Sequence, residues 1–109
     1  MNEATVIQLI QDLQIATTID EIAYVFTKEQ YVLIGKQDEG IVLVNLNQET
    51  TPKVFPFSVL EEVHIQTGVL QTTIQFSVKT NMYTFEIATG IFSKQAKQLK
   101  KLIRLFKLK

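Results

Sequence analysis

The sequence contains no cysteine. Disulfides and thiolate metal sites are therefore excluded, and this composition is typical of a reducing compartment. The first residues carry no lysine or arginine and Asp12 interrupts the first apolar segment, so we expect no secretory signal. No apolar run approaches the roughly 18 residues that a membrane-spanning helix needs. These absences together predict a cytoplasmic protein.

Residues that carry out chemistry are also scarce. His64 is the only histidine, and the alternation around it places it on the polar face of a strand, without the pocket that a general base needs. Glu61 and Glu62 are neighbours and would point to opposite faces of a strand. Asp38, Glu39 and Gly40 are typical of a turn. The four glycines are scattered and form no phosphate-binding loop.

This scarcity predicts a protein that is not an enzyme. We expect no catalytic residue, no metal ligand and no cofactor. The apolar fraction of 46% nevertheless indicates a folded chain, because a disordered segment carries fewer apolar residues.

Charge is balanced overall but is divided unequally along the chain. Residues 1–62 contain ten acidic residues and three lysines, and therefore a net charge of −7. Residues 63–109 contain eight basic residues and one acidic residue, and therefore a net charge of +7. This asymmetry is compatible with a basic face for an acidic partner, or with two halves that pair within the chain or between subunits.

Most of the chain shows the two-residue period of β-strands. The clearest case is the segment from Gln71 to Lys79, where Ile74, Phe76 and Val78 share one face, and the pattern resumes after Thr80 and Asn81. This indicates a hairpin with one buried face, and Asn81 is the residue that we expect to tolerate a left-handed turn. Seven strands are predicted in all, near residues 23–27, 31–35, 41–46, 53–55, 62–66, 71–79 and 83–87. The first two are apolar at nearly every position, which indicates cover on both faces.

A helical period marks the two ends of the chain. Residues 2–15 place Val6, Leu9, Ile10 and Leu13 in one stripe, so this helix is predicted to cover the outer face of the first strands. The final helix is predicted to begin near Ser93. Its apolar stripe consists of Ala96, Leu99, Leu102, Ile103 and Phe106. Strands in one run followed by a helix predict a mainly β chain with α (α+β): a small antiparallel barrel or bent sheet with the helix closing one end.

This order of elements resembles that of the bacterial pleckstrin-homology-like (PH-like) families, which have seven strands and then one helix. Residues 24–34 resemble their first hairpin, residues 55–63 their proline–aromatic segment before an acidic strand, and residues 68–87 their last three strands. The resemblance covers residues 20–107. It implies a single domain over residues 1–109, with a helical extension at 1–19 and a seven-stranded PH-like barrel with its capping helix at 20–109.

The sequence departs from the PH-like pattern where ligands are bound. Gln30 stands near the place where an arginine is common in these families. Members that bind phosphoinositides use several basic residues in the first hairpin, whereas this hairpin offers only Lys28, beside Glu29. The resemblance therefore implies the fold more strongly than it implies lipid binding.

These observations predict a binding module whose partner is a protein, with self-association into a homo-oligomer. The candidate contacts for an anionic partner are the basic residues of the final helix: Lys94, Lys97, Lys100, Lys101, Arg104 and Lys107. The alternatives are weak binding of an anionic membrane or phosphoinositide through this helix, and a small nucleic-acid-binding regulator. The last is disfavoured because Tyr83, Phe85, Phe92 and Phe106 are predicted core residues and cannot stack on bases.

Overall fold

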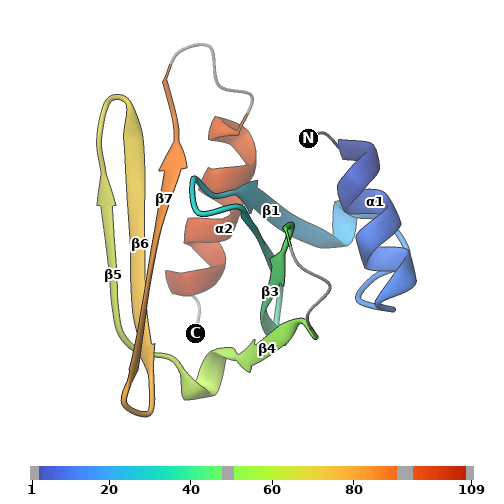
Figure 1. The fold of residues 1–109 in the computed structure, drawn as a ribbon, viewed down its shortest axis with the longest axis horizontal. Helices are drawn as coiled ribbons and strands as arrows, with labels where there is room; N and C mark the ends of the chain where they lie inside the picture. Colours follow the sequence, from blue (N-terminus) through green and yellow to red (C-terminus); the bar gives the residue numbers. More distant parts are fainter. Residues whose placement is uncertain (1–2, 48–50, 91–94, 108–109) are drawn as a thin grey trace.

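The computed structural model describes residues 3–47, 51–90 and 95–107, which form two antiparallel sheets and two helices (Figure 1). The first four strands form one sheet in chain order and the last three form the other. The elements are α1 (Glu3–Asp12), β1 (Ile22–Phe26), β2 (Tyr31–Lys36), β3 (Gly40–Asn45), β4 (Lys53–Pro56), β5 (Glu61–Thr67), β6 (Gln71–Val78), β7 (Asn81–Ala88) and α2 (Ala96–Lys107). The predicted α+β class is confirmed.

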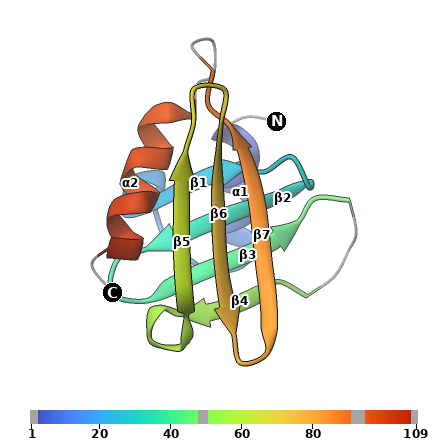
Figure 2. The same ribbon diagram turned by 90° about the vertical axis from the view of Figure 1, so that its left-hand side faces the viewer.

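The predicted single closed barrel is wrong, because the strands divide into sheets of four and three. Proline cannot donate a ladder hydrogen bond, and Pro56 is the last residue of β4. The 3₁₀ turn η2 (Phe57–Val59) follows at once and carries the chain to β5. In Figure 2 the three-stranded sheet lies in front and the strands of the other sheet cross behind it.

The main core lies between the two sheets and α2. The alternation predicted for β6 is confirmed at Ile74 and Phe76, which are fully buried, and at half-buried Gln75. It is broken at the end of the strand, where Ser77 is buried and Val78 is only half-buried. Tyr83 and Ile103 pack against this core but are partly exposed. Its buried members are Ala23, Val25, Leu33, Ile41, Leu43, Leu60, Ile74, Phe76, Phe85, Ile87, Leu99, Leu102 and Phe106.

A second core lies on the outer face of the four-stranded sheet, under α1. Val6 and Ile10 of the helix are fully buried there against Val32 and Ile34 of β2. The two-sided burial predicted for the first strands, with α1 as the second cover, is therefore confirmed. Leu13 was predicted in the buried stripe but is 37% exposed, because the helix ends at Asp12.

The end of α1 is fixed by the backbone. The N–H of Ile15 donates to Ile10 O at 2.9 Å, and that of Gln14 donates to Gln11 O at 3.2 Å. This pair of bonds is the Schellman motif, which requires a left-handed residue just after the helix. Gln14 occupies that position with φ of 55°.

Replacement of Gln14 by glycine is expected to raise the free energy of unfolding by about 1 kcal/mol. A side chain costs about 1–2 kcal/mol in the left-handed conformation, and the added freedom of glycine in the unfolded chain offsets part of the gain. Urea unfolding followed by circular dichroism measures the change. Gln11→Gly is the matched control and should be destabilising, because Gln11 lies within the helix. A Gln14→Gly variant less stable than the parent would contradict this account.

The tip of the β6–β7 hairpin differs from the prediction. Val78 pairs with Asn81, so the turn consists of Lys79 and Thr80. Lys79 takes the left-handed conformation, with φ of 57°, and Asn81 is the first residue of β7. The register of the two strands decides which residues form the turn. The buried faces of both strands must lie opposite each other across the ladder, and the turn consists of the residues left between them.

Candidate functional site

Helix α2 packs against β1 and β2, at the open corner between the two sheets (Figures 1 and 2). Its buried side chains are Leu99, Leu102 and Phe106, three or four residues apart as the sequence predicted. Ala96 was predicted on this stripe but is exposed, because it is the first helical residue. The predicted start near Ser93 lies outside the described residues.

The polar flank of α2 covers the free edge of β1. Gln95 Oε1 accepts a hydrogen bond from Phe26 N–H at 2.5 Å, and Gln98 Oε1 accepts one from Tyr24 N–H at 3.4 Å. Lys101 Nζ donates to Ile22 O at 3.1 Å. Three positions spaced three apart, the first directly before α2 and the other two within it, thus meet every second residue of the strand. A partner strand could pair with β1 only if it displaced α2.

This contact divides the predicted basic residues into two groups. Lys101 is half-buried and has a structural role at β1. Lys97, Lys100, Arg104 and Lys107 are exposed and lie three or four residues apart, so they form one row along the helix, hereafter the basic row. Lys94 lies outside the described residues.

Acidic side chains gather next to the basic row. Asp20 and Glu21 lie in the 3₁₀ turn η1 (Ile19–Glu21), and Asp38 and Glu39 lie in the turn between β2 and β3. A hollow of about 170 Å³ is lined by Asp20 and Glu21 on one side and by Lys101 and Arg104 on the other. The two charge signs that are separated in the sequence therefore meet at the surface.

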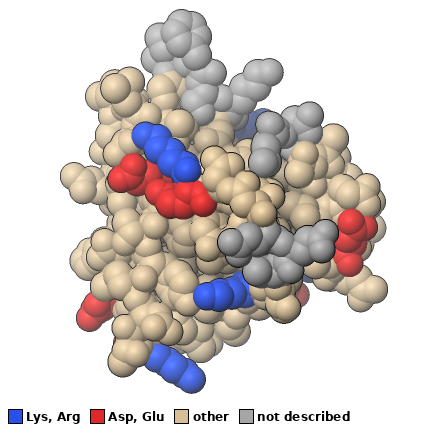
Figure 3. Space-filling model, viewed as in Figure 1, with Lys and Arg blue, Asp and Glu red and all other residues tan. Residues whose placement is uncertain are grey.

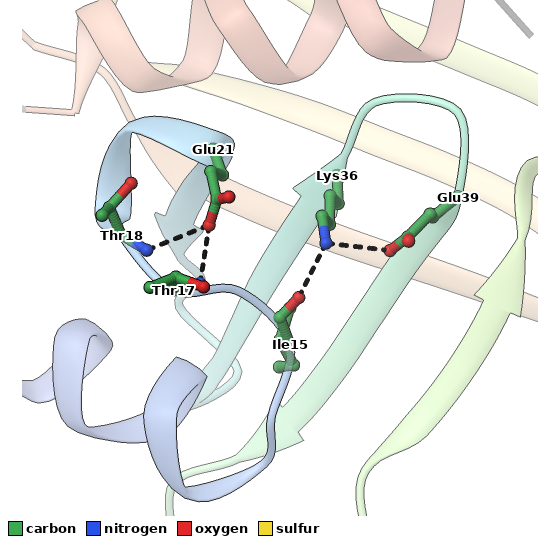
Figure 4. A network of polar contacts seen from close by, with 6 residues as sticks. All are labelled: Ile15, Thr17, Thr18, Glu21, Lys36 and Glu39. Atoms are coloured by element: carbon green, nitrogen blue, oxygen red, sulfur yellow. Dashed lines mark hydrogen bonds and ion pairs between the residues drawn. The ribbon is translucent and has the colours of Figure 1, made fainter.

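A network of polar contacts holds this acidic region in place (Figure 4). The backbone N–H groups of Thr17 and Thr18 donate to Glu21 Oε2 at 2.6 and 3.0 Å. These two bonds stabilise the ionised form and lower the pKa of Glu21, the bond from Thr18 most strongly. Lys36 Nζ donates to Ile15 O at 3.0 Å and lies 3.5 Å from Glu39 Oε2.

Few charges on this surface are neutralised by direct ion pairs. Lys36–Glu39 is the one ion pair within residues 3–47, 51–90 and 95–107. No ion pair therefore joins the basic row to another described residue. A different face of the molecule, seen in Figure 3, carries few charged side chains, and they form no continuous region of one sign.

The remaining candidates from the sequence do not converge on a pocket. His64 is exposed on β5, and the register of β5 shifts between Glu61 and His64. Glu62 lies in this bulge with φ of 51°. In the part of the chain that the structure describes, no three His, Cys, Asp or Glu side chains are grouped so that they could hold a metal ion.

The sequence identified the basic helix but not its second role. Gln95, Gln98 and Lys101 were missed as edge-capping residues, because no local pattern shows which strand a helix will lie beside. Neither helix, over the described residues, is both long enough and apolar enough to cross a membrane. No protein-family model, curated protein or solved structure matches the chain.

Proposed function

We propose that the chain is a PH-like binding module without catalytic activity, which binds protein and associates with itself. The order of the elements supports the fold part of this proposal. Over the described residues seven strands are followed by one helix, in the order that the resemblance implies, although the strands divide into sheets of four and three, and α1 is an addition on the outer face.

The basic row beside the acidic turns is the observation that carries the binding part. Four exposed cations share one helical face, and the adjoining turns supply the opposite charge. Exposed ion pairs contribute only about 0.2–1 kcal/mol each, so association through them is weak and sensitive to salt.

Light scattering over a series of protein concentrations tests self-association. At low salt we expect an average mass above that of one chain, rising with concentration. At 1 M salt the mass is expected to fall to that of the monomer, because the Debye length shrinks to about 3 Å. A monomer at every concentration and salt would refute self-association.

An anionic membrane is the alternative partner that the basic row favours. Each base near an anionic surface contributes about 1 kcal/mol, so four give about 4 kcal/mol, or roughly millimolar affinity. The apolar stripe of α2 is buried in the core and cannot insert. A single copy should therefore bind vesicles only weakly.

Sedimentation with phosphatidylserine vesicles distinguishes the two functions. If the membrane is the partner, the protein pellets at low salt and stays in solution when Lys97, Lys100, Arg104 and Lys107 are all changed to glutamine. Lys101 is left intact because it caps β1. If protein binding is the function, little parent protein sediments with the vesicles at any salt.

A further inference from the structure

The acidic side chains next to α2 border two neighbouring hollows. The hollow of about 170 Å³ adjoins a second of about 320 Å³, and Gln37 and Leu105 line both. Half-buried Leu105 and Phe57 supply apolar surface within it. We call the two hollows together the trench. Its lining includes Asp20 and Glu21 at one end and Asp38 and Glu39 at the other.

Two acids of the trench are open to a partner. Glu21 accepts two backbone hydrogen bonds and Glu39 pairs with Lys36. Asp20 and Asp38 are exposed, and neither forms an ion pair with another of the described residues. The trench therefore offers apolar side chains beside exposed negative charge, which complements a lysine or arginine with its aliphatic stem.

The basic row adjoins the same trench. Arg104 belongs to the row and lines the smaller hollow. From Lys97 to Lys107 the row extends about 15 Å at 1.5 Å per residue. A surface that carries positive charge beside negative charge is self-complementary about a two-fold axis. The positive region of each copy then faces the negative region of the other, which gives two equivalent contacts.

We propose that the partner of this surface is a second copy of the chain, docked about a two-fold axis so that the basic row of each copy lies over the trench of the other. This rests on the proposed self-association and assigns its interface. One helix face and one groove form a small interface, below the roughly 800 Å² per partner of stable complexes, so the dimer is weak and depends on concentration.

Paired charge reversals test this interface. Lys100→Glu/Arg104→Glu cancels the net positive charge of the row and places two acids within it, and Asp20→Lys/Asp38→Lys cancels the net negative charge of the four trench acids. Asp38 has φ of 66°, and a lysine at such an angle is tolerated in this chain at Lys79, where φ is 57°. At low salt each variant alone is expected to be monomeric by light scattering. An equimolar mixture is expected to recover a mass of two chains, because the reversed charges of the two variants then face each other with opposite signs, and the unchanged row and the unchanged trench form the second contact.

A second pair of substitutions controls for the change in total charge. Lys53→Glu/Lys79→Glu alters the net charge as much as the row variant does, at exposed positions outside α2. This variant is expected to dimerise like the parent. Circular dichroism melts check that every variant is folded, and any variant that is not folded is replaced by its neutral form, Lys100→Gln/Arg104→Gln or Asp20→Asn/Asp38→Asn.

The outcomes separate this interface from the proposed function. If the parent dimerises and the row and trench variants dimerise equally well, the interface is wrong and self-association stands. If the mixture grows beyond two chains, the contact is head-to-tail and the two-fold axis is wrong. If the parent is a monomer at every salt and concentration, the self-association and its interface both fail.

Discussion

Replacement of Phe76 by alanine is expected to lower the free energy of unfolding by about 3–5 kcal/mol. Phe76 is fully buried in the main core, between the two sheets and α2. The centroid of its ring lies 6.0 Å from the ring centroid of Phe55 in β4, 5.5 Å from that of Tyr83 in β7 and 6.1 Å from that of Phe106 in α2. The truncation removes buried apolar surface and leaves a cavity that backbone from two sheets cannot easily close.

Urea unfolding measures this loss, and the unchanged slope of the transition would show that the denatured state is not altered. Met82→Ala, on the adjoining strand, is the control. Its side chain is 52% exposed, so the change should stay within about 0.5 kcal/mol. A loss below 1 kcal/mol at Phe76 would mean that the sheets and α2 do not share one core. Because small domains have only about 5–15 kcal/mol of stability, the expected loss is a large fraction of the total.

Replacement of Leu102 by alanine is expected to cost about 2–5 kcal/mol, because this side chain holds α2 against the first sheet. Leu102 is fully buried, and its Cδ1 lies only 2.6 Å from the position that a Cβ on Gly35 would take. The absence of a side chain at Gly35 is thus what lets the helix approach β2. Thermal and urea unfolding measure the cost, and Ala96→Gly, at the exposed start of the helix, should cost about 1 kcal/mol or less.

The same contact predicts a coupling between the two positions. Gly35→Ala alone should cost about 1–3 kcal/mol, because the new methyl group meets Leu102 in a packed core. In the Leu102→Ala background that methyl has room, so the double variant should be more stable than the sum of the single losses predicts. Additive losses would show that Leu102 does not lie on Gly35.

The glycines show where local reasoning fails. Gly40 was predicted as part of a turn, yet Asp38 takes the left-handed conformation there. A Cβ on Gly40 would lie 2.2 Å from Phe55 O, so glycine is required because β4 approaches closely. A glycine that a turn requires and a glycine that a close backbone approach requires look the same in the sequence. Only the pairing of Gly40 with Pro56 distinguishes them.

The candidate surface likewise has one part that the sequence predicts and one part that it does not. The exposed side of α2 follows from its periodicity, so Lys97, Lys100, Arg104 and Lys107 could be predicted. The structural role of Lys101 could not, because its partner, Ile22, lies 79 residues away in the sequence. The acidic side of the surface comes from two separate turns, which no spacing in the sequence relates to α2.

The sequence by itself determined the number and order of the strands, the buried faces of β6, β7 and α2, and the position of α1 over the first sheet. These depend on period and on apolar side chains, which act between near neighbours. The tertiary structure decided that the strands form two sheets, that α2 caps β1, and that opposite charges meet along the trench. These depend on the packing of distant segments, where small differences in register and approach select one arrangement among several that the same pattern allows.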